Sequence, residues 1–433
     1  MQMIKWSAIA VAVAAATSSV AMANQADSKG FVEDSSLNLF TRALYMNRDF
    51  RNGDGNIKDS SKASGYKSGY REETGLGVRV LFESGFTQGT VGVGFDAHSL
   101  SSIKFDSGKG RTGNGMFSTN ADGEPEDTQS EIGGAIKFRV SDTVLKHGNM
   151  MVDTPVFSTD DSRILPEVAT GTLLTSDEIA GLTLTAGRFT AISSQTATGR
   201  DSNTSEDADG NVHTLEEANI LGANYSFNDN FSGAVFFSDV EDHFKKRYLN
   251  LNYSQELAEG QAFGIDFNFY RTTDDGAKKS GAIDNKIYSI APSYTLGAHK
   301  FTVGYQQSSG ETGYGYGIDG NGTIYLANSV QYSDFNSADE RSYQARYDLN
   351  MASYGVPGLS FMTRYVTGRD IDVGGGQEGK EHEWDFETKY VLQEGAAKDL
   401  SFRLRSAIYR ANSDVAKDVN DFRLIVEYPL SIL

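Results

Sequence analysis

Long apolar runs are missing from this chain after residue 23, and its mean hydropathy is −0.41. A helix needs about 20 consecutive apolar residues to cross a bilayer. The sequence therefore excludes a helical membrane protein.

The first 23 residues have the pattern of an export signal. Lys5 supplies a positive charge, residues 6–16 form an apolar run too short to span a bilayer, and Ala21, Met22 and Ala23 form a small-residue cleavage site. We expect a secretory signal peptide over residues 1–23 and one mature domain over residues 24–433.

Cysteine is absent, and proline is scarce, with six residues against 46 glycines. An exported protein of this size without disulfide bonds needs another source of rigidity. A closed barrel supplies it, because every ladder hydrogen bond is then internal. The shortage of proline suits a chain of many strands, since proline cannot donate to a sheet.

Acidic residues outnumber basic ones, and the formal net charge is −19. Lys5 is the only charged residue before position 24, so its removal leaves −20. Such acidity argues against a nucleic acid partner. It does not describe the inner surface of a barrel, where charge can be distributed differently.

Short segments that alternate apolar and polar residues recur along the mature chain, which is typical of strands with two unlike faces. Eight short connections alternate with nine long ones, and together they join 18 strands. An even strand number with short turns at one end and long loops at the other is typical of outer-membrane barrels. We predict an all-β fold, an 18-stranded antiparallel transmembrane β-barrel with inward-folded constriction loops. The long connections lie near residues 51–69, 99–128, 152–167, 191–216, 240–246, 273–284, 309–340, 370–381 and 411–419.

Cations recur on the polar faces of the last five strands. An arginine that faced lipid at the membrane midplane would cost roughly 2–4 kcal/mol, so these side chains should point into the lumen. One interpretation is a basic ladder that passes anionic groups from site to site; the other is structural pairing with inward carboxylates such as Asp348, Asp385, Glu387 and Glu427. Arg42 is ambiguous, because it shares its face with Phe40 and Leu44. The proposed ladder consists of Arg346, Arg364, Lys389, Arg403, Arg405 and Arg423.

Two long stretches, residues 150–174 and 309–342, mix apolar anchors with hydroxyl groups and carboxylates. A wide 18-stranded barrel would hold an aqueous channel, so selectivity requires loops that fold inward. These stretches are candidates for that role; the alternative is that each is an ordinary extracellular loop.

Catalytic and metal-binding signals are weak. There are six histidines, and no HExxH motif is present. Residues 52–56 and 207–211 resemble calcium loops but lack the full spacing with a terminal glutamate, so turn formation explains them better. We expect no catalytic residue, no metal and no cofactor. The competing functions are an outer-membrane barrel enzyme of the protease or lipase type and an exported β-rich adhesin.

Several motifs resemble the OprD (Occ) family of substrate-selective outer-membrane porins. They are Ser-Asp-Thr-Val-Leu-Lys at 141–146, Asp-Thr-Pro-Val-Phe at 153–157, Asp-Ser-Arg-Ile-Leu-Pro at 161–166, Leu-Thr-Ala-Gly-Arg-Phe at 184–189, Tyr-Ser-Asp-Phe-Asn at 332–336 and the final Glu-Tyr-Pro-Leu-Ser-Ile-Leu. The resemblance covers essentially the whole mature chain, although Leu433 replaces the terminal phenylalanine common in outer-membrane proteins.

The resemblance implies a Gram-negative outer-membrane channel, narrowed by its third and seventh outer loops, for passive diffusion of small water-soluble carboxylates such as amino acids or other organic acids. It implies a basic ladder made of the six cations above. It also implies contact with outer-membrane lipid and lipopolysaccharide, and either a monomer or a weakly associated homotrimer. The constriction candidates are Asp160, Asp161, Arg163, Ser333 and Asp334.

Overall fold

The computed structural model describes residues 24–51, 69–108, 110–120, 123–196 and 199–433. The signal peptide expected at residues 1–23 and the calcium-like motif at 52–56 lie outside these residues. Within the described ranges, no helix is long and apolar enough to cross a membrane.

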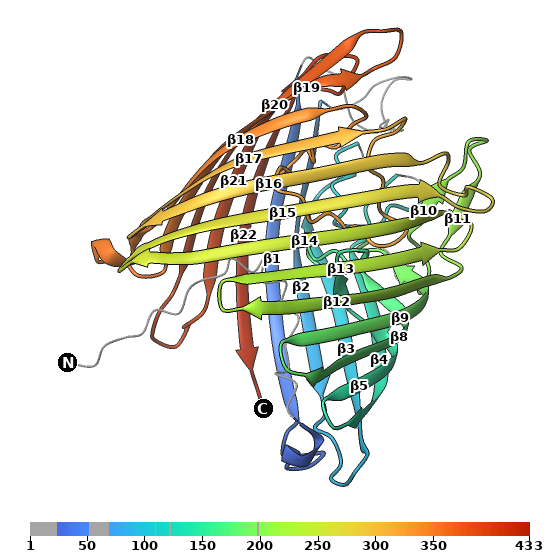
Figure 1. Cartoon of the computed structure of the whole chain (residues 1–433), viewed down its shortest axis with the longest axis vertical. Coiled ribbons are helices and arrows are strands. Elements are labelled where there is room, and N and C mark those ends of the chain that lie inside the picture. The colour runs from blue at the N-terminus through green and yellow to red at the C-terminus, as the bar shows by residue number, and fades with distance from the viewer. Residues whose placement is uncertain (1–23, 52–68, 109, 121–122, 197–198) are drawn as a thin grey trace.

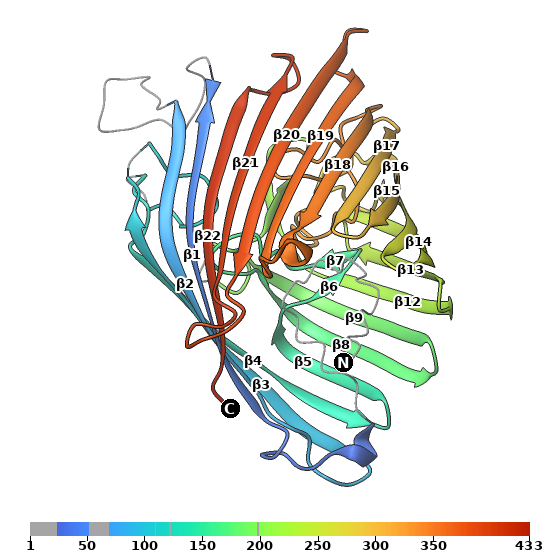
Figure 2. The same cartoon turned by 90° about the vertical axis from the view of Figure 1, so that its left-hand side faces the viewer.

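Eighteen strands form a single antiparallel sheet, and the pairing of the first strand with the last closes it into a barrel (Figure 1). Figure 2 shows these two strands, β1 and β22, side by side. The predicted strand number and architecture are confirmed. The barrel strands are β1 (Ser36–Phe50), β2 (Tyr70–Glu83), β3 (Gly92–Asp106), β4 (Thr128–Val140), β5 (Thr143–Met150), β8 (Val168–Ile179), β9 (Leu182–Ser193), β12 (Ala218–Asn228), β13 (Phe231–Val240), β14 (Phe244–Ala258), β15 (Gln261–Asp274), β16 (Asp284–Leu296), β17 (His299–Ser309), β18 (Arg341–Asn350), β19 (Leu359–Asp372), β20 (Glu378–Val391), β21 (Ser401–Ala411) and β22 (Val419–Ser431).

Two long loops carry the predicted constriction residues. Loop L3, residues 151–167, joins β5 to β8 and contains the two-residue strands β6 (Asp153–Thr154) and β7 (Phe157–Ser158). Loop L7, residues 310–340, joins β17 to β18. Both are shorter than the stretches predicted from sequence, because residues 168–174 already pair within β8 and residues 341–342 within β18.

The alternation of the strands separates a lipid-facing surface from a lumen-facing one. On β4, Ile132 is 82% exposed, whereas Lys137 is 6% exposed. On β21 and β22, Phe402 and Leu424 are exposed, whereas Arg423 is buried. The apolar side chains that point outward form the surface that meets lipid, and Lys137 and Arg423 point into the lumen, as the sequence predicts.

Part of the inner wall is apolar, which simple alternation does not predict. Leu44 and Met46 of β1 are buried in one cluster with Ile164 and Leu165. The latter two residues belong to the part of L3 that leads into β8. A second cluster joins inward residues of β9 and of β12 to β16 to apolar residues of L3 and L7. The two loops are therefore packed against the inside of the barrel, and these contacts hold the loops in place.

Candidate functional site

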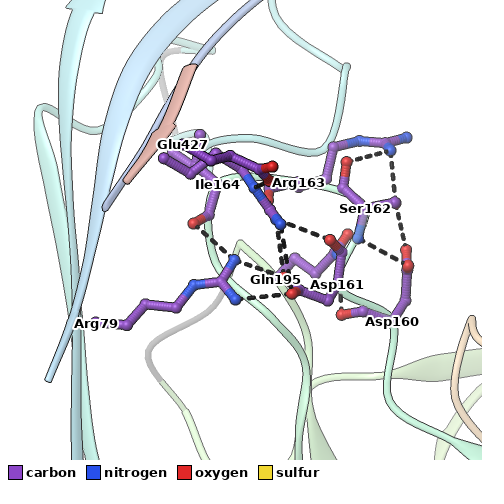
Figure 3. Close-up of polar contacts among 9 residues, drawn as sticks. Arg79, Asp160, Asp161, Ser162, Arg163, Ile164, Gln195 and Glu427 are labelled. Atoms are coloured by element: carbon purple, nitrogen blue, oxygen red, sulfur yellow. Dashed lines mark hydrogen bonds and ion pairs between the residues drawn. The ribbon is translucent and has the colours of Figure 1, made fainter. Parts of the chain in front are cut away.

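Loop L3 is fastened to the barrel wall by Asp161. Its carboxylate accepts hydrogen bonds from Arg42 at 2.9 Å. It also accepts from Arg79 at 2.8 Å (Figure 3). Burial alone would raise the pKa of Asp161, but the charges of Arg42 and Arg79 outweigh it and hold the pKa below its ordinary value. Asp161 therefore remains ionised at neutral pH and acts as the loop's anchor.

Arg42 connects this anchor to the last strand of the barrel. Its Nε donates to Glu427 at 2.7 Å, and its Nη1 also donates to the backbone carbonyls of Asp161 and Arg163. The ring of Phe40 lies 5.3 Å from the Arg42 guanidinium and 4.9 Å from that of Arg79. The sequence leaves the direction of Arg42 open, because it shares a face of β1 with Phe40 and Leu44. In the structure all three face the lumen, where L3 covers the apolar side chains.

Arg163 and Asp160 lie beside the anchor. Arg163 donates to the backbone carbonyl of Asn114 at 2.6 Å, and the Asp160 carboxylate accepts from the amide and hydroxyl of Ser162. Burial, followed by the charges of Arg423 and Arg48, lowers the pKa of Arg163 to about 9, so it remains a cation at neutral pH. Arg163 therefore extends the positive charge of the barrel wall onto the loop.

The two L7 candidates make contacts with the barrel and with their own loop. The Ser333 hydroxyl donates to Glu381 at 2.9 Å, and its amide donates to Glu383 at 2.8 Å. Asp334 accepts hydrogen bonds from Ser329 and Tyr316. Burial raises the pKa of Asp334, and the nearby charge of Asp160 contributes in the same direction. The structure thus brings the L3 and L7 candidates close together.

L7 also binds L3 directly. The amide and side chain of Asn321 donate to Glu167, and the amides of Ser158 and Gly322 exchange hydrogen bonds with backbone carbonyls across the two loops. On the barrel side, Lys246 of β14 donates to Asp319 at 2.6 Å, and both side chains are fully buried. The two loops therefore form one interlocked unit inside the barrel.

A second buried contact of L7 is acidic. Glu340, at the end of L7, is fully buried beside Glu381 of β20, and its Oε2 accepts from the amide of Ser337 at 3.1 Å. Burial, followed by the charge of Glu381, raises the pKa of Glu340 to about 9 from an ordinary value of 4.5. Docked L7 therefore holds a proton on Glu340 at neutral pH.

This proton makes L7 docking depend on pH. Undocked, Glu340 releases its proton near pH 4.5, whereas docked it keeps the proton up to about pH 9. Docking is therefore strongest below pH 4.5 and weakens as pH rises toward 9. We expect Glu340→Gln to lessen this decline, since Glu381 remains as a buried carboxylate, and to protect L7 at least as well as the wild type at pH 8.

Hydrogen exchange of residues 332–340 between pH 6 and pH 9, with amide exchange corrected for its intrinsic pH dependence, would test the prediction. Glu311→Gln is the matched control, because it removes the same charge from an exposed position of the same loop. Faster exchange in Glu340→Gln than in the wild type at pH 8 would contradict the prediction.

The six predicted ladder cations lie on neighbouring strands at matching register positions. Arg346 is the register partner of Arg364, Lys389 of Arg403, and Arg405 of Arg423. Like charges directly opposite each other are unfavourable unless carboxylates or a bound anion compensate them. The row continues onto β1, where Arg42 and Arg48 are the register partners of Glu427 and Asp421.

Carboxylates compensate this row unevenly. Arg346 binds Asp348 through two hydrogen bonds of 2.8 and 2.7 Å, Arg364 binds Asp385, and Arg423 binds Asp421. Near the middle of the row, by contrast, Arg403 and Arg405 share Glu387 at 3.9 and 3.2 Å, and the Nε atoms of both make no hydrogen bond within the described chain. Lys389 has no ion pair or hydrogen bond to any described residue.

The structure places two further cations in the lumen row that the sequence analysis does not predict. Arg48 pairs with Asp421 at 2.7 Å, and its guanidinium lies 5.1 Å from the ring of Tyr332 in L7. Lys300 of β17 is the register partner of Asp348 and so extends the row by one strand. The rule that a cation avoids the lipid face would have placed Arg48 in the lumen.

The calcium-like motif at residues 207–211 is a turn between β10 (Thr204–Glu206) and β11 (Val212–Thr214). Asp207 accepts hydrogen bonds from the amides of Asp209 and Asn211 and from the side chains of Asn211 and His213. The Asp207 carboxylate therefore accepts its hydrogen bonds from within the turn, which is the usual role of an aspartate at the start of a turn. Across the described residues, no group of three or more His, Cys, Asp or Glu side chains is arranged to hold a metal.

Comparisons with known proteins agree with this geometry. Residues 29–432 match the family described as outer membrane porin, OprD family. Porin D of Pseudomonas aeruginosa is 45% identical over the full length of both chains, and the porin-like protein GalP of Pseudomonas putida is 34% identical over 94% of this chain and 95% of its own.

Solved structures show the same fold. Pseudomonas aeruginosa OccK9 (OpdG) superposes with a TM-score of 0.85 at 34% identity, over 93% of this chain and 100% of its own. Pseudomonas aeruginosa OprD superposes with a TM-score of 0.79 at 43% identity, over 95% and 99% of the two chains. These relatives are porins, so the protein is a channel rather than an enzyme and resides in the outer membrane of a Gram-negative bacterium. The chain belongs to the OprD family of outer-membrane porins.

Proposed function

We propose that this porin mediates passive diffusion of small carboxylate-bearing solutes along its row of lumen cations. The observation that carries the proposal is the under-compensated group formed by Lys389, Arg403 and Arg405. Arg403 and Arg405 are about one quarter exposed, with side-chain values of 29% and 21%, and share one carboxylate, Glu387. A guanidinium with free donors binds a carboxylate through charge-assisted hydrogen bonds.

The arrangement of the lumen cations suits the passage of a carboxylate through the channel better than its tight binding at one site. Neighbouring cations occupy adjacent strands, so a carboxylate that leaves one finds the next within a few ångströms. Resident carboxylates such as Glu387 compete for each cation and keep every site weak. Conduction requires several such weak sites instead of one tight site. A solved relative, Pseudomonas aeruginosa OpdK, is described with vanillate, an aromatic carboxylate.

Removing two of these cations tests the proposal. We expect Arg403→Gln with Arg405→Gln to slow carboxylate uptake into liposomes by about tenfold, since a charge-assisted hydrogen bond contributes about 1.5–3 kcal/mol. Uptake of a neutral sugar of similar size should change little. A panel of amino acids, aromatic acids and short dicarboxylates would rank the substrates.

The matched control is Arg341→Gln with Arg369→Gln, which removes the same charge from lipid-facing positions of β18 and β19. Both of these arginines are about half exposed on the outer surface. Unchanged carboxylate uptake in the Arg403 and Arg405 variant, together with lowered thermal stability, would assign the cations to structural pairing and would overturn the proposal.

A further inference from the structure

Three cations lie side by side on the lipid-facing surface of the barrel. They are Arg247 of β14, Arg271 of β15 and Lys286 of β16, on strands that are neighbours in the sheet (Figure 1). Their outward direction follows from the chain neighbours of each, because Lys246, Tyr270 and Ile287 are fully buried inside the barrel against L7. We name Arg247, Arg271 and Lys286 the outer basic trio.

The outer basic trio has fewer carboxylate partners than cations, as do Lys389, Arg403 and Arg405 in the lumen. Arg247 is the register partner of Arg271, and Arg271 of Lys286, so each pair places like charges directly opposite each other. Asp284 contacts Arg271. The side chains of Arg247 and Lys286 have no hydrogen bond or ion pair with any part of the chain that the structure describes.

A comparable group on β18 to β20 consists of Arg341, Arg369 and its register partner Lys380, and two of these three cations are compensated from within the described chain. Arg341 and Arg369 are register partners, and both contact Asp370, at 3.4 and 3.8 Å. Arg369 also donates to the hydroxyl of Tyr343. In the outer basic trio, by contrast, only Arg271 contacts a carboxylate among the described residues, which favours an anion bound from outside.

The position of the trio indicates what that anion belongs to. All three residues lie at the long-loop ends of their strands, which in outer-membrane barrels face the outside of the cell. Directly below them on the same face are Leu249, Phe269 and Tyr288, and below these are Leu251, Phe267 and Ile290. A ligand that covers both levels must have an anionic head and apolar chains.

We propose that the outer basic trio binds the phosphate groups of the phosphorylated glycolipid that forms the outer leaflet. The trio is a docking surface for one lipid molecule, with a sugar phosphate between Arg247, Arg271 and Lys286 and acyl chains along Phe269 and Leu251. This inference rests on the fold and on the family, and is independent of the proposed carboxylate pathway.

Native mass spectrometry of the detergent-solubilised mature chain tests the proposal, with bisphosphorylated lipid A as the probe. We expect Arg247→Gln, Arg271→Gln and Lys286→Gln together to weaken binding at least tenfold, since each cation near an anionic lipid surface contributes about fivefold. The wild type should bind dephosphorylated lipid A at least tenfold more weakly than the phosphorylated form. Lys29→Gln with Lys398→Gln, two exposed cations at the short-turn end, should bind as the wild type does.

Channel conductance in planar bilayers should be unchanged in the triple variant, because none of the three residues faces the lumen. Should the triple variant fail to fold, Arg247→Gln and Lys286→Gln as single variants keep the test, each with an expected loss of about fivefold. Equal binding of the phosphorylated and dephosphorylated lipids, equal binding by variant and wild type, or equally tight binding of phosphatidylglycerol would each overturn the proposal.

Discussion

Asp161→Asn is expected to release L3 from the barrel wall and to widen the pore. The asparagine amide cannot neutralise Arg79, whose side chain is 5% exposed and has Asp161 as its carboxylate partner among the described residues, whereas Arg42 keeps its ion pair with Glu427. Breaking a buried ion pair from one side costs about 3–5 kcal/mol. The docked state of L3 should therefore lose about that much free energy, and single-channel conductance in planar bilayers should rise several-fold, with weaker ion selectivity.

Asp160→Asn is the matched control for this experiment. Asp160 precedes Asp161 in the chain, so this substitution removes the same charge from the same loop. The Asp160 carboxylate, however, accepts its hydrogen bonds from Ser162 within L3 and not from the barrel wall. The conductance of Asp160→Asn should stay near that of the wild type. Conductance of Asp161→Asn within error of the wild type would show that the apolar contacts of Ile164 and Leu165 hold L3 without the ion pair.

The strand pattern of this barrel could be predicted from sequence because two simple rules agree. Alternation separates two faces, and the cost of a charge in lipid says which face is inside, as Lys137 and Arg423 show. The rules fail on β1, where Phe40 and Leu44 share the inner face with Arg42. Apolar side chains can line a lumen when a loop covers them, and the strand alone does not reveal that cover.

The candidate constriction residues show a different limit of sequence reasoning. Asp161, Ser333 and Asp334 are polar residues of the two loops that the sequence predicts to fold inward, and the structure brings these loops together. Most of their hydrogen-bonding capacity, however, is used to fasten L3 and L7. The partners of Asp161 are 82 and 119 residues away in the chain, and no local pattern identifies such partners.

Lys246→Met is expected to undock the central part of L7 from β14. The Lys246 ammonium lies 2.6 Å from Asp319, both side chains are fully buried, and the ring of Tyr314 lies 4.8 Å from the ammonium. Methionine fills a similar volume but leaves the Asp319 carboxylate without its counter-charge, at a cost of about 3–5 kcal/mol. Hydrogen exchange of L7 around residues 317–323 should accelerate by roughly 10²- to 10⁴-fold.

Two further variants separate the effect of charge from the effect of shape. Lys246→Met with Asp319→Asn should recover most of the lost protection, because the asparagine carbonyl can still accept from Gly317 and Thr323 while no charge remains buried. Lys245→Met changes the neighbouring lysine, whose partners Asp239 and Asp275 are partly exposed, so exchange of residues 317–323 should stay near the wild-type rate. If the double variant exchanged as fast as Lys246→Met alone, the lysine would hold L7 through its shape and hydrogen bonds, and not by neutralising Asp319.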